Sequence, residues 1–383
     1  MGIALAGVAA AGAAGQERAR GLGVPFDGTP GPFDAITDVH GVAVGYTTLI
    51  VGVGPLVVGQ GPVRTGVTAI LPRGADFHDP VFAGFFSQNG NGEMTGIHWV
   101  EESGFLEGPI MITNTHSVGT VRDAVIGWEM AHGATQYPWS LPVVAETYDG
   151  FLNDINGFHV TAADTVHAIE SARGGAVAEG NVGGGTGMAC LGFKGGSGTA
   201  SRALTAAQGG YTVGVFVQCN TGSARELRIA GVPVGRLLNP ASPNAALYGR
   251  DREDMGSIII VIATDAPLTA GQLDRLCKRA TLGLGRVGGT SGDGSGDLFV
   301  SFSTANAGAD IAASARTRGT PPPLAHIAML PNWALGPVFD ATIRATEEAI
   351  VNAMAGAQTM TGINGHTIRA LPHDRLRAIM QGK

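Results

Sequence analysis

The sequence predicts a layered α+β fold, and three observations carry that prediction. Short apolar segments typical of strands recur along the chain, several of them bounded by glycine. Segments with apolar residues at helical spacing lie between some of these strands. Strand-to-strand connections are frequent and strands do not alternate regularly with helices, which disfavours a doubly wound parallel sheet.

The first predicted strand lies within residues 36–45, where apolar residues alternate and glycines punctuate the pattern. The other predicted strands are residues 67–71, 110–113, 143–147, 212–218, 258–263 and 298–303. The segment 258–263 is the most apolar of them. A run of this kind is typical of a strand that lies in the interior.

Two helices are predicted toward the end of the chain. Thr269 and Gln272 form a capping-box pattern that marks the start of the first helix. The apolar residues after it share one helix face: Leu273, Leu276, Cys277, Ala280 and Leu284. The second helix, residues 340–355, has an apolar stripe with Glu347 and Glu348 on its opposite side.

The length of 383 residues alone suggests two or three domains, but no composition shift, charge run or polar linker divides the chain convincingly. We therefore expect one domain. The best candidate for an exposed joint is residues 238–255, where polar and charged residues replace the apolar pattern. A cut in the chain would be tolerated at such a joint.

Composition excludes several kinds of partner. Charged residues make up 14% of the chain and the formal net charge is −7, so a nucleic acid is not expected to bind. No segment has the roughly 18 uninterrupted apolar residues needed to span a membrane. The Ala/Gly-rich residues 3–14 are either a flexible arm or the remnant of a signal peptide. The compartment therefore stays open, with the cytoplasm slightly favoured and the periplasm expected if that segment is a signal.

The chain has three cysteines, Cys190, Cys219 and Cys277, which lie in apolar surroundings. Their number is odd and no C-x-x-C spacing occurs. We expect three buried free thiols.

The most informative motif is Gly256-Ser257, placed directly before the apolar strand 258–263. A serine hydroxyl is a weak nucleophile unless a base lies beside it, and the α-amine of the same residue can serve as that base. The amine exists only if the Gly256–Ser257 bond is cut, and its ordinary pKa of about 7.7 to 8.0 suits it to proton transfer. The alternative interpretation is an ordinary Gly-Ser turn that leads into a core strand.

Other motifs give weaker signals. The glycine-rich residues 180–202 allow close backbone approach but match no phosphate loop, and the G-x-G-x-x-G at 283–288 follows a predicted helix instead of opening one. Neither G-x-S-x-G nor H-E-x-x-H is present, so α/β-hydrolase and zincin mechanisms have no support. His116 is either a structural histidine or a catalytic one.

Polar residues also follow three predicted strands. Asn220 ends one strand beside glycine and suits an oxyanion hole, because a fixed N–H donor there can point into a cleft. Glu146 and Tyr148 end another strand, and the carboxylate can hold a substrate ammonium. Ser295 and Asp297 offer a hydroxyl and a carboxylate before strand 298–303. Each of these residues alone is also compatible with a turn or a cap.

Together these segments resemble the self-processing family of L-aminopeptidase/D-Ala-esterases and β-aminopeptidases. These proteins are N-terminal serine nucleophile hydrolases with an ornithine acetyltransferase-like fold. The most specific matching segments are residues 113–119, 183–202, 218–220, 256–257 and 294–297. The resemblance implies a four-layer αββα sandwich. It also implies a cut between Gly256 and Ser257 into chains 1–256 and 257–383, which remain associated, commonly as a homotetramer.

The resemblance also implies roles for single residues. Ser257 matches the nucleophile and Asn220 the oxyanion-stabilising residue. Ser295 matches a serine that is hydrogen-bonded near the nucleophile's amine. Asp297 stands where some relatives carry Glu, so its acidic role is kept with a shorter reach.

Two further matches concern the substrate. Glu146 matches the carboxylate expected to bind the substrate's free amine. Tyr148 matches a tyrosine of the L-aminopeptidase branch that β-aminopeptidases replace, which favours α-amino substrates.

The sequence therefore predicts a self-processing aminopeptidase that releases N-terminal residues from short peptides, amides or esters through an acyl-enzyme on Ser257. No metal or cofactor is expected. Two alternatives remain: an acyltransferase of the ornithine acetyltransferase type, which typically presents Thr where this chain has Ser257, and a binding protein that has lost processing.

Overall fold

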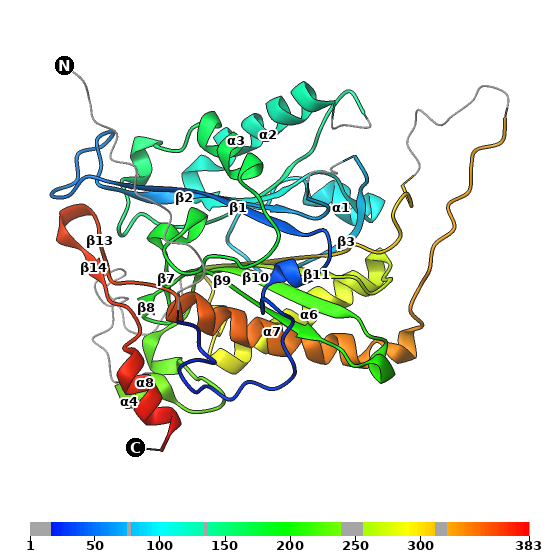
Figure 1. The fold of residues 1–383 in the computed structure, drawn as a ribbon. Helices are drawn as coiled ribbons and strands as arrows, with labels where there is room; N and C mark the ends of the chain where they lie inside the picture. Colours follow the sequence, from blue (N-terminus) through cyan, green and yellow to red (C-terminus); the bar gives the residue numbers. More distant parts are fainter. Residues whose placement is uncertain (1–16, 75–77, 134–136, 239–255, 311–319, 383) are drawn as a thin grey trace.

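A computed structural model describes residues 17–74, 78–133, 137–238, 256–310 and 320–382. Two sheets form its centre (Figure 1). The larger sheet has the strand order β4-β3-β12-β11-β10-β9 and the smaller one the order β1-β2-β5-β6. The predicted exposed joint, apart from Leu238, and the predicted Ala/Gly-rich arm lie outside the described residues.

The strand bounds follow the apolar segments of the sequence. The six-stranded sheet consists of β4 (Phe105–Leu106), β3 (Val81–Gly90), β12 (Gly296–Ser303), β11 (Ser257–Thr264), β10 (Thr212–Asn220) and β9 (Gly196–Ala203). The four-stranded sheet consists of β1 (Ala43–Val51), β2 (Val63–Leu71), β5 (Ile110–Asn114) and β6 (Val143–Thr147). Two short ladders are added: β7 (Ala189–Cys190) with β8 (Phe193–Lys194), and β13 (Met360–Thr361) with β14 (Thr367–Ile368).

Helices cover the outer faces of both sheets (Figure 1). The helices α2 (Val118–His132) and α3 (Ala162–Glu170) pack on the four-stranded sheet, and α6 (Ala270–Val287) and α7 (Gly336–Ala355) pack on the six-stranded sheet. The other α-helices in the described part of the chain are α1 (Ile97–Ser103), α4 (Val234–Leu238) and α8 (His373–Met380). The structure therefore confirms a mixed fold of sheets and helices.

The packing of β11 explains why residues 258–263 are all apolar. Ile258, Ile260 and Ile262 face α6 and α7, whereas Ile259 and Val261 face the four-stranded sheet. All of them are fully buried. A strand that is covered on both faces gains from apolar residues at every position, because alternate side chains point to opposite faces.

Two sequence predictions need correction. The segment 36–45 is not one strand, because Ile36–Asp38 form a 3₁₀ turn and β1 starts at Ala43. The carboxylate of Asp38 accepts from the backbone N–H groups of Phe33 and Ala35, which holds the turn closed. Side-chain bonds of this kind compete with strand pairing.

The second correction concerns the cysteines. Cys190 and Cys219 form a disulfide with Cα atoms 5.4 Å apart, and of the predicted free thiols only Cys277 is free and buried. An odd cysteine count does not exclude a pair, and residues 29 positions apart meet here because β7 packs beside the end of β10.

The side of α7 that carries the two glutamates is buried. Glu348 is fully buried and pairs with Arg20 and Arg202 at 2.7 Å each, and Glu347 pairs with Arg286 at 2.6 Å. The arginines compensate for the loss of water around these carboxylates, since a buried charge without a partner is costly.

Candidate active site

The first residue of β11 lies between the ends of two neighbouring strands. Ser257 is the register partner of Asn220, the last residue of β10. On the other side, β12 runs parallel to β11 and places Asp297 opposite Ile258. Three of the predicted site residues are therefore brought together by strand register alone.

Backbone packing fixes the start of β11. Ser257 is 7% exposed, and its hydroxyl accepts a hydrogen bond from the Gly296 N–H at 3.0 Å. A Cβ at Gly256 would lie 2.1 Å from the carbonyl oxygen of Asn220, so only glycine fits there. Contact with β10 therefore requires glycine at position 256.

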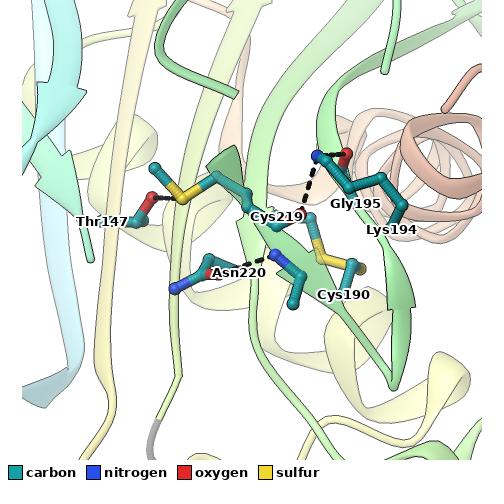
Figure 2. Close-up of a disulfide and its surroundings, with 8 residues drawn as sticks. Thr147, Cys190, Lys194, Gly195, Cys219 and Asn220 are labelled. Carbon is teal, nitrogen blue, oxygen red and sulfur yellow. Dashed lines mark hydrogen bonds between the residues drawn. A yellow bond between two sulfur atoms is a disulfide. The ribbon is translucent and has the colours of Figure 1, made fainter. Parts of the chain in front are cut away.

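The Asn220 amide has a single orientation that satisfies its neighbours. Its Oδ1 accepts from the Ala189 N–H at 2.8 Å, and its Nδ2 donates to the Tyr148 carbonyl at 2.9 Å. A flipped amide would place a donor against a donor and an acceptor against an acceptor. Because an amide nitrogen carries two hydrogens, a second N–H remains for a ligand. Figure 2 shows Asn220 beside the disulfide of Cys190 and Cys219.

Ser295 and Asp297 form one buried pair at the start of β12. The Ser295 hydroxyl lies 3.1 Å from Asp297 Oδ2 and 2.9 Å from the Gly292 carbonyl, with a hydrogen bond to each. Asn89 on β3 holds this turn, because its Nδ2 donates to the Ser295 carbonyl at 2.6 Å. Both Ser295 and Asp297 are fully buried. The sequence reasoning missed Asn89, since nothing in its local pattern indicates this contact.

Glu146 reaches the site from the other sheet. It stands near the end of β6 and is 4% exposed, and its carboxylate accepts from the Glu93 N–H at 3.0 Å and from the Thr115 hydroxyl. Burial raises the pKa of this carboxyl above its usual value, and the bonds from Thr115 and Glu93 oppose that rise. A cation that displaced water from this carboxylate would lower its pKa again.

Gly92 lies between Glu146 and the backbone that contacts Ser257. A Cβ at Gly92 would lie 3.1 Å from Gly296 Cα and 3.3 Å from Glu146 Oε1. Gly92 is therefore flanked by Gly296, whose N–H binds the Ser257 hydroxyl, and by the carboxylate of Glu146. The two sheets therefore bring the Ser257 hydroxyl and the Glu146 carboxylate to the same region.

Tyr148 and His116 differ from these buried groups. Tyr148 contributes its carbonyl to Asn220, while its side chain is 44% exposed. His116 is exposed and stacks on Phe158 at 6.0 Å between ring centroids, and its charge when protonated lowers the pKa of Glu146. Thr115, the neighbour of His116, is the residue that contacts Glu146 directly. Within the segment 113–119, the side chain that is hydrogen-bonded to Glu146 is therefore that of Thr115.

Neither a metal centre nor a membrane segment is visible in the part of the chain that the structure describes. No group of three or more His, Cys, Asp or Glu side chains suits a metal ion there. None of the described helices has the length and apolar character to cross a membrane.

Comparisons with known proteins identify the family of the chain. The model of peptidase family S58 matches residues 34–368. The β-peptidyl aminopeptidase BapA of Sphingosinicella microcystinivorans is 53% identical over 391 aligned positions, which cover 98% of this chain and 96% of that protein. The chain belongs to peptidase family S58.

Solved structures show the same relationship. A Burkholderia sp. β-aminopeptidase superposes with a TM-score of 0.86 at 47% identity and covers 96% of this chain and 99% of its own. The L-aminopeptidase D-Ala-esterase/amidase from Ochrobactrum anthropi, described as a variant of the Ntn hydrolase fold, gives a TM-score of 0.85 at 45% identity, with 95% and 98% covered. These matches confirm the predicted family and the predicted class of enzyme, a serine aminopeptidase.

Proposed function

We propose that the chain cuts itself between Gly256 and Ser257 and then releases N-terminal residues from short peptides, amides or esters. The observation that carries the proposal is the position of Ser257 at the first residue of β11, with its hydroxyl held by Gly296 and its strand partner Asn220 alongside. A cut there gives chains 1–256 and 257–383 from one αββα domain. The stacking of helices on the outer faces of two packed sheets supports a four-layer sandwich.

In the proposed mechanism the Ser257 hydroxyl attacks the substrate carbonyl while the α-amine of Ser257 takes the proton. The remaining N–H of Asn220 stabilises the oxyanion, because its amide is already locked by Ala189 and Tyr148. Ser295 and Asp297 lie at the start of the neighbouring strand β12 and provide polar groups near the new amine. The oxyanion then collapses, and the bond to the leaving amine or alcohol breaks as that group takes the proton back from the α-ammonium. Water, deprotonated by the same α-amine, then hydrolyses the acyl-enzyme and frees the Ser257 hydroxyl.

Glu146 is proposed to bind the substrate's free ammonium. Its carboxylate is buried and close to the backbone that positions Ser257, and a charge-assisted hydrogen bond would add about 1.5 to 3 kcal/mol to binding. This makes the enzyme an exopeptidase, since a blocked amine loses that interaction.

A direct experiment compares alanine p-nitroanilide with its N-acetyl counterpart. We expect turnover of the free amine and little or none of the acetylated substrate. Equal cleavage of both would contradict the aminopeptidase assignment while leaving Ser257 as nucleophile.

Two observations favour different substrates, which carry the free amine on either the α or the β carbon. The exposed phenol of Tyr148 favours α-amino residues, as in the L-aminopeptidase branch. The 53% identity to a β-peptidyl aminopeptidase favours β-amino residues. The ratio of kcat/KM for alanine and β-alanine p-nitroanilides decides between them. We expect the α-substrate to be preferred, with Tyr148→Phe reducing that preference.

For the assembly we propose a homotetramer of processed chain pairs, as the family resemblance implies. Sedimentation equilibrium of the purified protein measures it, and a monomeric mass would contradict it. An acyltransferase is the alternative that a competition assay between water and an amine acceptor tests.

A further inference from the structure

A lysine lies fully buried behind the Asn220 amide. Lys194 is the last residue of β8 and its side chain is 0% exposed. Among the described residues it forms no ion pair with a carboxylate. Burial alone lowers the pKa of its amine to about 7. An ammonium in such a place is costly unless polar groups around it replace water.

Backbone carbonyls provide that replacement. The Lys194 Nζ donates to the carbonyls of Met188 and Gly195 at 2.8 Å each and to that of Gly185 at 3.4 Å. Three acceptors match the three hydrogens of an ammonium. They belong to the glycine-rich segment 183–196.

Met188 is held from several directions. Its carbonyl accepts from the Gly195 N–H at 3.0 Å as well as from Lys194, and its sulfur accepts from the Thr147 hydroxyl at 2.9 Å. Figure 2 shows Thr147 and Lys194 near Asn220, with their hydrogen bonds dashed. The peptide group between Met188 and Ala189 therefore has a fixed orientation.

That peptide group carries the N–H that binds Asn220. The Ala189 N–H donates to Asn220 Oδ1 at 2.8 Å, and Ala189 pairs with Lys194 in the β7–β8 ladder. The next residue, Cys190, is joined to Cys219, the neighbour of Asn220. A chain of direct contacts thus runs from the ammonium through one peptide plane to the amide.

We propose that Lys194 is a positioning residue for the reaction: its buried ammonium fixes the Met188–Ala189 peptide, and that peptide holds the Asn220 amide in the orientation that stabilises the oxyanion. This inference rests on the role proposed above for Asn220. Lys194 itself touches neither the substrate nor Ser257 in this account.

The test combines Lys194→Met with Asn220→Asp, measured on protein whose processed fraction is known from its mass. Asn220→Asp keeps an acceptor for Ala189 and removes the donor. We expect Lys194→Met to lower kcat at least about 10-fold with KM changed less than about 3-fold. In the Asn220→Asp background the same change should lower kcat less than about 2-fold, because the amide it positions is gone.

Arg202→Met is the matched control. Arg202 is also a buried cation, but it binds the carboxylate of Glu348 and backbone carbonyls remote from Asn220. Its loss should lower the Tm and leave the kcat of folded, processed enzyme unchanged. A similar fall in kcat in both variants would show a general loss of packing and overturn the positioning role.

Hydrogen exchange of the Ala189 amide gives a readout that needs no processing. It should speed up in Lys194→Met and stay unchanged in Arg202→Met. If Lys194→Met gives no soluble protein, Lys194→Gln replaces it, and its two donors should preserve part of both kcat and amide protection. Unchanged exchange at Ala189, or independent effects of Lys194→Met and Asn220→Asp on kcat, would overturn the inference. An unaffected kcat in Asn220→Asp alone would instead refute the proposed role of Asn220.

Discussion

The ends of the two sheets supply the site in different ways. At the end of the six-stranded sheet, Ser257, Asn220 and Asp297 are set by the register of β10, β11 and β12. At the end of the four-stranded sheet, one carboxylate, Glu146, depends on side-chain and loop contacts from Thr115 and Glu93. Backbone register is rigid, whereas a side chain can adapt to a ligand. The difference suggests that the first end performs the chemistry and the second end recognises the substrate.

The largest effect should follow from a change at the six-stranded end. Asn220→Asp removes the proposed oxyanion donor without removing the acceptor for Ala189, so kcat should fall roughly 10²-fold or more while KM changes little. Steady-state kinetics on fully processed protein measures this. If KM rises and kcat is unchanged, the division of labour between the two sheets is wrong.

A change at the four-stranded end should act on recognition. Glu146→Gln keeps the size of the side chain and removes its charge, so the preference for free over acetylated amine should shrink by about 10- to 100-fold. In the wild type, KM should rise as the pH falls through the pKa of Glu146, which burial places above its usual value. A preference that survives in Glu146→Gln would remove this carboxylate from amine binding.

A change in stability with no direct effect on the reaction is expected close to the four-stranded end. Asp149 is buried, and burial raises its pKa to about 7 from an ordinary 3.8. The folded carboxyl thus keeps a proton that the unfolded chain releases, so the free energy of unfolding should fall as the pH rises between about 4 and 7, by at most about 4 kcal/mol. Asp149→Asn should flatten this dependence of Tm on pH. An identical pH slope in both proteins would contradict it.

The features that the sequence could predict are those that local patterns encode. The segment 258–263 and the capping box at Thr269 are local patterns, and both appear in the structure as β11 and the start of α6, where Gln272 Oε1 accepts from the Thr269 N–H at 3.1 Å. The polar residues at strand ends were also visible, because strand ends can be located from apolar runs.

Contacts between distant segments could not be predicted in this way. Lys194 looks like a loop residue in a glycine-rich stretch, yet three carbonyls surround its amine. Cys190 and Cys219 meet only after β7 packs beside β10. Glu348 seemed to belong to a polar helix face until Arg20 and Arg202 covered it. Tertiary packing decides each of these cases, and no local pattern records it.

The central claim is that Ser257 becomes the N-terminal nucleophile of its own chain. Intact-mass spectrometry of the purified wild type and of Ser257→Ala tests it most directly. The account predicts two wild-type fragments, residues 1–256 and 257–383, and one uncut, inactive chain for Ser257→Ala. A wild-type protein that is active as a single uncut chain would contradict the account.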